Sequence, residues 1–529
     1  MCKEIIMGSS NVTYYGERYR GSLDETTCSI LDQLIELDEQ NGVVPDLAHV
    51  IYQLSDSDVQ NITDIGDIYG AYDTSAIEKP LGTLRDDQTI GVAYMYYAGN
   101  LILGDSVGLG KTVETAGLIN LLSTENKDFR YLVLTEKNLA EQFRSELVKF
   151  TGEYVEWVKS GEKDEIDRFV ERHPVDESMN CGVVGTHALL TADRFLGWLE
   201  QSRRLVKFPF DMLVIDESSP LGGKSTNKIV TNFKLLKKYF KRIVFLNATP
   251  FESKLQIFYN QLDLLDSKLL PTKQAFTKEY VIMSYTGMYP KPTGKYKNGQ
   301  QFKSLVGYRY FARTRKSKGA VMVDCDGGLI LSRLSSVQNE LLRKSSMNKL
   351  VYDCPTYIDR SIEFTEENVP KLASLMEVLR DKCSDADTVL IYVYYKEAQK
   401  YLSQYLTDRG YSCRVLNGDA TINERTKVIN GFKNKEFKIL ITNVQKGLNF
   451  GECNYCIFYG FQTNPSQMVQ FEGRTTRSFD IVGKHVYILC SLGTEYNTLL
   501  SDLKTRTRGM ADTTNTDLSV VLSILLGEE

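Results

Sequence analysis

Short apolar runs alternate with longer amphipathic stretches along two blocks of the chain, and this alternation predicts strands and helices. In the first block, residues 81–256, we expect strands at 101–103, 131–134, 182–184, 212–215 and 243–246. In the second block, residues 366–500, we expect them at 389–393, 414–416, 438–441, 455–459 and 486–489. Strands that alternate with helices indicate parallel sheets with helices on both faces. The pattern therefore predicts two α/β lobes.

The remaining parts of the chain do not show this alternation. Residues 1–80 are rich in acidic residues and are predicted to form an N-terminal accessory segment. Residues 257–365 are predicted to be an insertion between the lobes. Residues 501–529 form a tail whose apolar stretch, 518–526, is expected to dock as a helix. A chain of 529 residues is too long for one core, which agrees with several domains.

Composition narrows the class of protein. Hydrophobic residues make up 42% of the chain and charged residues 25%, which is ordinary for a globular protein. No apolar stretch approaches the ~18 residues of a membrane span, and the first residues lack a secretory pattern. The ten cysteines follow no disulfide framework, which is typical of reduced thiols. We expect an intracellular protein, with a monomer favoured.

The stretch 104–112, GDSVGLGKT, predicts a phosphate-binding loop. It follows a predicted strand and precedes a helical pattern that starts near Val113. Gly108 and Gly110 allow the backbone to direct its N–H groups at an anion. Lys111 is then expected to reach the β- and γ-phosphates of ATP, and the Thr112 hydroxyl to bind Mg²⁺. Asp105 stands where the strict motif has its first glycine.

An acidic pair about a hundred residues later completes this chemistry. Asp216 and Glu217 follow the apolar run 212–215. Asp216 is predicted to hold Mg²⁺ through water, and Glu217 to polarise the attacking water. An Asp-Glu pair is weak evidence alone, but after a phosphate loop it indicates a nucleoside-triphosphate hydrolase.

Positive charge is concentrated in one tract, although the net charge is −5. No acidic residue lies between Glu279 and Asp324. Basic and aromatic residues alternate there, and the candidate nucleic-acid contacts are Lys291, Lys295, Lys297, Arg313 and Arg315. Basic side chains neutralise phosphates and aromatic ones pack on sugars or bases. A solvated loop explains the tract equally well.

The second block lacks a phosphate loop but contains an arginine pair. Arg474 and Arg477 are three residues apart, which places both on one face of a helix. Both guanidinium groups are then able to reach one phosphate cluster. We expect them to complete the nucleotide site from the second lobe, where an arginine finger is worth ~10³–10⁵ in rate.

These motifs resemble the superfamily 2 helicases, and within them the Snf2/Swi2-like ATP-dependent DNA translocases. The resemblance runs from about residue 84 to 500. Residues 105–112 are similar to the family's D-E-M-G-L-G-K-T loop, and residues 470–477 match Q-x-x-G-R-x-x-R. The resemblance implies two tandem RecA-like lobes, ATP and Mg²⁺ as cofactors, and double-stranded DNA as the partner. RNA polymerase or other DNA-bound proteins are further candidate partners.

The resemblance also carries family roles onto residues of the first lobe. Gln88, in the stretch 84–88, is similar to the family's adenine-reading glutamine. Thr135 and Thr186 lie in stretches that resemble those used to track a nucleic-acid strand. Thr249, in the stretch 247–250, belongs to a motif that links hydrolysis to nucleic-acid binding.

Four residues of the second lobe receive roles in the same way. Thr442 and Asn449 correspond to nucleic-acid contacts, and Gly447 to a nucleotide contact. Gln470 corresponds to a coupling residue. Together these assignments predict duplex translocation that moves or displaces bound proteins.

Departures from the family keep two alternatives open. Ser219 replaces the usual His after the Asp-Glu pair, and 478–480 replace the Gly-Gln expected after Arg477. No accessory targeting domain is visible, which favours a compact viral or bacterial member. A strand-separating DNA or RNA helicase is one alternative. The other is a scaffold, gated by ATP without hydrolysis, that binds nucleic acid or a polymerase.

Overall fold

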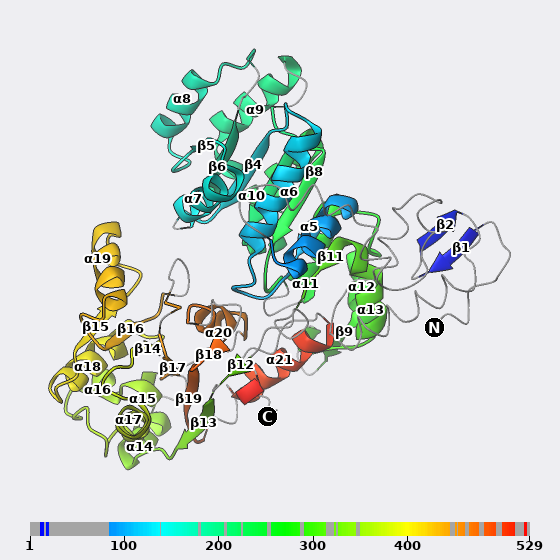
Figure 1. The fold of residues 1–529 in the computed structure, drawn as a ribbon. Coiled ribbons are helices and arrows are strands. Elements are labelled where there is room, and N and C mark those ends of the chain that lie inside the picture. The colour runs from blue at the N-terminus through cyan, green and yellow to red at the C-terminus, as the bar shows by residue number, and fades with distance from the viewer. Residues whose placement is uncertain are drawn as a thin grey trace. The chain divides into compact units, whose positions relative to one another are not determined.

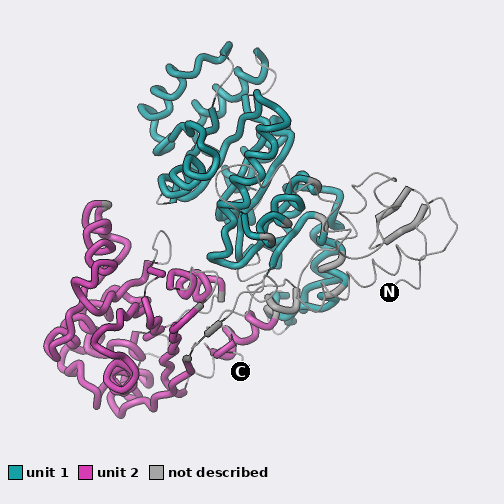
Figure 2. Tube along the Cα trace, in the orientation of Figure 1, with its two compact units in different colours: residues 1–319, 512–517 teal, residues 320–511, 518–529 magenta. Residues whose placement is uncertain are grey.

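The computed structural model contains two compact units (Figure 1, Figure 2). Unit 1 comprises residues 1–319 and 512–517, and unit 2 comprises residues 320–511 and 518–529. The structure describes residues 11–14, 17–20, 84–137, 139–177, 181–205, 209–223, 226–250, 255–285, 290–313, 322–323, 326–344, 350–444, 450–451, 453–460, 465–475, 481–493, 500–513 and 523–525.

Unit 1 is built on a seven-stranded parallel sheet. Its strands lie in the order β11 (Tyr310–Phe311), β3 (Leu101–Leu103), β8 (Arg242–Leu246), β7 (Met212–Asp216), β4 (Tyr131–Thr135), β6 (Gly182–Thr186) and β5 (Val155–Trp157). Nearly every residue of β3, β4, β6, β7 and β8 is buried, as expected for parallel strands covered on both faces.

Helices cover this sheet, as Figure 1 shows. Their bounds are α5 (Asp86–Ala98), α6 (Lys111–Glu125), α7 (Ala140–Thr151), α8 (Lys163–Arg172), α9 (Asp193–Leu205), α10 (Lys228–Leu236), α11 (Leu255–Leu265), α12 (Lys273–Tyr280) and α13 (Gly299–Val306). Helices α5, α6 and α7 share one core with alternate residues of the strands, such as Leu101, Leu103, Val133 and Val214. That alternation follows from the two-residue period of a strand.

Unit 2 contains a six-stranded parallel sheet. Its strands lie in the order β13 (Asp326–Ser332), β19 (His485–Ser491), β17 (Tyr455–Phe458), β14 (Val389–Tyr392), β16 (Ile439–Thr442) and β15 (Cys413–Leu416). The helices of this part are α14 (Ser336–Lys344), α15 (Leu350–Asp353), α16 (Pro355–Ile358), α17 (Pro370–Glu377), α18 (Lys396–Thr407), α19 (Ile422–Lys433), α20 (Pro465–Glu472) and α21 (Ser501–Thr513). Helices α17 and α18 pack on its strands through a second core.

Short strand pairs complete the described elements. Strand β1 (Asn11–Tyr14) pairs antiparallel with β2 (Glu17–Arg20) in the N-terminal segment. Strand β9 (Val281–Ser284) pairs antiparallel with β10 (Lys291–Tyr296). Strand β12 (Met322–Val323) pairs in parallel with β18 (Ile481–Val482). Within the described residues, no helix is long and apolar enough to span a bilayer.

The predicted fold class, two RecA-like lobes of parallel sheet flanked by helices, is confirmed. All ten predicted strands are present within a residue or two of their expected bounds. Helix α6 begins at Lys111, earlier than the expected start near Val113. The segment 257–365 also contributes β11 to the first sheet and β13 to the second, which the sequence did not predict. Most of the predicted tail helix, 518–526, lies outside the described residues.

Candidate active site

The predicted phosphate loop connects β3 to α6 at the carboxyl edge of the first sheet. Gly108 and Gly110 have φ values of 83° and 97°, a left-handed region that glycine adopts without strain from a Cβ. The loop therefore leads into the N-terminus of α6, where free backbone N–H groups are able to bind an anion. The Lys111 ammonium donates to the backbone oxygens of Asp105, at 2.5 Å, and Ser106, at 3.3 Å. Burial lowers the pKa of Lys111, and the neighbouring carboxylates oppose that shift.

The acidic pair lies beside this loop, at the end of β7. Asp216 Oδ2 accepts a hydrogen bond of 2.7 Å from the Thr135 hydroxyl, and the Asp216 backbone oxygen lies 2.7 Å from His187 Nε2. Burial and the neighbouring Glu217 raise the pKa of Asp216 to about 7. Glu217 has a φ of 49°, a left-handed conformation that is uncommon outside glycine and concentrates at functional sites.

This electrostatic arrangement fits a divalent cation. A carboxyl that resists ionisation because of burial and a like charge is stabilised as a carboxylate by a nearby positive charge. Thr112 is the second residue of α6 and follows Lys111 directly, so it lies at the end of the phosphate loop. No group of three or more metal-ligating side chains occurs among the described residues. Mg²⁺ in nucleotide sites needs only one or two protein oxygens, with phosphates and water supplying the rest.

A buried arginine that follows β11, Arg313, contacts the phosphate loop and α6. Arg313 Nη2 lies 2.8 Å from Asp105 Oδ2 and 2.9 Å from Glu114 Oε1 on α6. Its Nη1 donates to the backbone oxygen of Asp87, and its guanidinium lies over the Phe311 ring at 4.5 Å. The side chain is only 6% exposed and both carboxylates are fully buried.

The prediction that Arg313 contacts nucleic acid is therefore wrong. Its positive charge is already neutralised by Asp105 and Glu114, and burial keeps it from a phosphate backbone. Burial alone lowers the pKa of Arg313, but these two carboxylates outweigh it and the net shift is upward. The sequence did not reveal this, because Arg313 lies in a basic tract and its two acidic partners are about two hundred residues away.

A buried polar network joins the acidic pair to the loop that follows β8. The Ser218 hydroxyl donates to Gln261 Oε1 on α11 at 2.6 Å. Asn247 Nδ2 lies 3.4 Å from that same oxygen and 3.2 Å from Ser219 Oγ. Gln261 Nε2 donates to the Pro250 backbone oxygen at 2.9 Å, and Gln261 is fully buried. Gln261 was not predicted, because a polar residue within a mainly apolar helix pattern does not by itself indicate a buried partner.

Two other predicted residues of unit 1 lie within this framework. Thr249 is buried, and its backbone N–H donates to Asn247 Oδ1 at 3.0 Å. Gln88 is also buried, and its Oε1 accepts from the Arg85 backbone N–H at 3.1 Å as part of a helix cap. Any side chain at Gly110 would collide with the Gln88 amide, so Gln88 packs directly against the phosphate loop. Its role at adenine stays a prediction.

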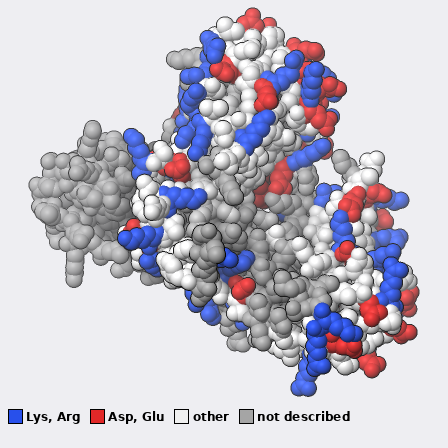
Figure 3. Space-filling view, turned by 180° about the vertical axis from the view of Figure 1, so that it is seen from behind, with Lys and Arg blue, Asp and Glu red and all other residues white. Residues whose placement is uncertain are grey.

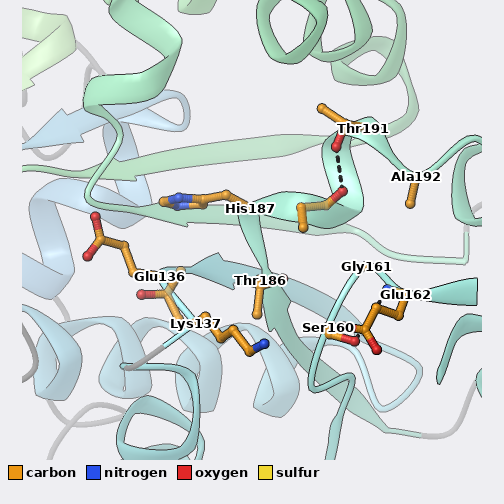
Figure 4. A pocket seen from close by; sticks show the side chains of 11 residues that line it. Glu136, Lys137, Ser160, Gly161, Glu162, Thr186, His187, Thr191 and Ala192 are labelled. Carbon is orange, nitrogen blue, oxygen red and sulfur yellow. Dashed lines mark hydrogen bonds between the residues drawn. The ribbon is translucent and has the colours of Figure 1, made fainter. Parts of the chain in front are cut away.

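A pocket of about 490 Å³ lies where β4 and β6 end (Figure 4). Thr135 and Thr186, the last residues of these strands, pair across the sheet. Thr186, Lys137 and Ser160 line the pocket, and the buried Thr186 hydroxyl has no hydrogen-bond partner among the described residues. Thr135 also lines the pocket, and its hydroxyl donates to Asp216; its contact with nucleic acid stays a prediction.

Three predicted residues of unit 2 are described, and all are buried. Thr442, the last residue of β16, uses its hydroxyl to accept from the Val444 backbone N–H at 2.9 Å, and its contact with nucleic acid stays a prediction. Gln470 lies on α20, and Arg474 follows that helix. Their coupling and catalytic roles stay predictions. The predicted sites Arg315, Gly447, Asn449 and Arg477 lie outside the described residues.

Fold and site together define a nucleoside-triphosphate-binding protein with tandem RecA-like lobes. A family model described as the SNF2-related domain matches residues 51–385, and one described as the helicase conserved C-terminal domain matches residues 370–479. The first match alone spans more than half of the chain, so the chain belongs to the SNF2-related family. The predicted resemblance to superfamily 2 is confirmed, and an ATP hydrolase of the helicase type is confirmed as the class.

Individual relatives are distant. The chain is 21% identical over 493 residues to the DNA repair and recombination protein RAD54B of Mus musculus, covering 78% of this chain and 54% of that protein. It is 22% identical over 430 residues to the ATP-dependent helicase YqhH of Bacillus subtilis, covering 74% and 72%. The chain thus spans about half the length of the RAD54B proteins that it matches.

Among solved structures, the SWI2/SNF2 ATPase core of Sulfolobus solfataricus in complex with dsDNA matches with a TM-score of 0.38 and 19% identity. That match covers 82% of this chain and 97% of the other. A score this low bears on neither fold nor function, and the family rests on the sequence matches.

Proposed function

We propose that this chain hydrolyses ATP with Mg²⁺ and uses the energy to translocate on double-stranded DNA, moving or displacing bound proteins. The observation that carries the proposal is the meeting of Lys111, Asp216 and Glu217 at one edge of the first sheet. Burial lowers the pKa of Lys111, and the charges of Asp216 and Glu217 both act against that shift, so the three charges lie close enough to interact. The family supports the same chemistry.

Each side chain has a task that its surroundings support. Lys111, released from the backbone oxygens of the loop, neutralises the β- and γ-phosphates. Thr112 and Asp216 would hold Mg²⁺, which when bound would neutralise charge on the phosphoryl group. Glu217 orients the attacking water beside them. Thr135 keeps Asp216 in place through its hydroxyl.

Contacts to the DNA backbone carry no sequence information and allow a protein to slide along it. The pocket at Thr186 is proposed to bind a segment of that backbone, because it contains a buried hydroxyl that has no hydrogen-bond partner among the described residues. Duplex DNA is preferred here to RNA because the relatives that match are named for DNA repair and recombination.

The test is steady-state ATP turnover by the purified chain, alone and with duplex DNA, single-stranded DNA or RNA. We expect the strongest stimulation by duplex DNA, followed by displacement of a triplex-forming strand without separation of a forked duplex. Lys111→Ala should lower turnover at least about 100-fold, as loss of a phosphate-stabilising donor does elsewhere. The matched control is Lys127→Ala, an exposed lysine just beyond the end of α6.

The alternatives predict different results. Preferential stimulation by single strands, with fork separation, would identify a strand-separating helicase. Nucleotide and DNA binding without turnover would identify a gated scaffold. Normal turnover by a folded Lys111→Ala protein would refute the assignment of the site.

A further inference from the structure

Part of the basic tract forms a defined hairpin in the structure. Strands β9 and β10 pair antiparallel, with Lys291 opposite Ser284 and Pro292 opposite Met283. The Thr293 hydroxyl donates to the Ile282 backbone oxygen at 2.8 Å. These cross-strand bonds place the lysines of β10 on an ordered backbone.

An aromatic cluster packs α12, the helix that leads directly into β9, against α11, α13 and β11. Phe302 of α13 lies 5.7 Å from Phe276 and 5.3 Å from Tyr280, both on α12, measured between ring centroids. Phe258 of α11 lies 5.8 Å from Phe302 and 4.8 Å from Tyr310 of β11. All five rings are buried, and closely packed aromatic side chains hold their elements in one arrangement.

The β9–β10 hairpin and α12 together form a surface that we call the platform. Exposed positive charge surrounds a hollow on it. Within the described residues, none of its five exposed lysines forms an ion pair; they are Lys273, Lys278, Lys291, Lys295 and Lys297. Three of them line the hollow, whose volume is about 910 Å³, together with Tyr285, which is 76% exposed. Figure 3 shows Lys and Arg side chains, with few acidic ones among them, on this part of unit 1.

The platform and the Thr186 pocket lie at opposite edges of the sheet. The platform packs on β11, the first strand of the sheet order, whereas Thr186 ends β6, five strands further along. Five spacings of about 4.8 Å amount to roughly 24 Å. A duplex of roughly seven base pairs has that length, at about 3.4 Å per base pair. The platform is therefore a separate surface from the pocket.

We propose that the β9–β10 hairpin and α12 form a second docking surface for the phosphate backbone of duplex DNA. The inference rests on the proposed function, which requires duplex binding, and adds where the second contact is made. Lysines without carboxylate partners complement phosphates and carry no sequence preference. Duplex DNA is stiff over about 150 base pairs, so it can contact both surfaces without losing conformational entropy. A flexible single strand must lose conformational entropy to contact both.

The test compares the salt dependence of duplex binding by the full chain and by a Lys291→Ala/Lys295→Ala variant. If each lysine neutralises one phosphate, the slope of log affinity against log salt should become shallower by ~1.8. The ratio of the two affinities should then be about 12-fold larger at 50 mM than at 200 mM salt. The matched control, Lys127→Ala/Lys234→Ala, removes two exposed charges elsewhere on unit 1 and should leave the slope unchanged.

ATP turnover without DNA checks that both variants are folded. An unchanged slope in the hairpin variant, or an equal change in the control, would overturn the second docking surface and leave the proposed function intact. An equal loss for single strands would overturn the preference for a duplex. Failure of the unaltered chain to bind duplex DNA at all would overturn the proposed function, and this inference with it.

Discussion

Removing the Arg313 guanidinium tests how the phosphate loop is held. The substitution Arg313→Met keeps most of the side-chain volume but deletes both ion pairs, to Asp105 and Glu114. It also removes the donor to the Asp87 backbone oxygen, so the loop, α6 and the start of α5 lose their common contact. We expect loss of stability in unit 1 and weaker nucleotide binding.

The magnitude follows from burial. Asp105 and Glu114 have no exposed side-chain surface, so the variant would leave two carboxylates buried without their counter-charge. Removing one partner of a buried ion pair typically costs about 3–5 kcal/mol. Arg309→Met is the matched control from the same segment. Its pair with Asp266 is longer, at 3.3 Å, and about a quarter exposed, so about 1 kcal/mol is expected.

The chain contains a convenient probe for this measurement. Both of its tryptophans, Trp157 and Trp198, belong to unit 1, so their fluorescence reports unfolding of that unit alone. Denaturant titrations monitored in this way avoid treating a two-unit protein as a single transition. Nucleotide affinity is measured in parallel with a fluorescent ATP analogue.

A cost below about 1 kcal/mol, or one equal to that of Arg309→Met, would refute the argument. A rescue experiment separates charge from packing. Adding Asp105→Asn and Glu114→Gln to Arg313→Met removes the unpaired charges, and most of the lost stability should return. If the triple variant is as unstable as the single one, buried charge is not the cause.

Three further outcomes are expected. Because the pKa of Asp216 is raised to about 7, protons compete with the metal for this carboxyl, and the affinity for Mg²⁺-nucleotide should fall about eightfold between about pH 7.5 and pH 6. In the chain without nucleotide, the contribution of the Asp216 carboxyl to folding stability is largest below its usual pKa and is lost as the pH rises to 7. Thr135→Val removes a hydrogen bond that lowers this pKa, so the midpoint of the nucleotide titration should move to higher pH. Gln261→Leu should cost about 1–3 kcal/mol in the tryptophan assay, because Ser218 and Asn247 lose a buried partner; an unchanged midpoint would contradict the polar network.

The fold was predictable where strands are buried on both faces. Such strands appear as continuous apolar runs, as at Leu101–Leu103 and Val389–Tyr392, and their alternation with helices determines a parallel sheet. This signal is weaker in the unpredicted strands β5, β11 and β13, although β13 contains the apolar run Leu329–Leu331. Strand β5 contains Glu156, β13 contains two glycines, and β11 has only two residues within a basic tract. Tertiary pairing at the edge of a sheet, rather than local pattern, determines these elements.

The candidate site was predictable only where a motif is contiguous. The loop around Lys111 and the pair Asp216–Glu217 are short stretches whose residue types reveal their chemistry. Arg313 was misassigned because a buried and an exposed arginine look alike in sequence. Gln261 was missed because its polar partners lie on other elements, far from it in the sequence.

The side-chain contacts that hold this site in place join residues that are far apart in the sequence. Arg313 and Asp105 are 208 residues apart, Thr135 and Asp216 are 81 apart, and Ser218 and Gln261 are 43 apart. The first two pairs meet because parallel strands bring their carboxyl ends to one edge of the sheet, whereas Gln261 reaches Ser218 from helix α11. Substituting a motif residue such as Lys111 therefore tests the chemistry, whereas substituting Arg313 or Gln261 tests the fold that positions it. Only variants of the second kind distinguish this arrangement from any other chain with the same motifs.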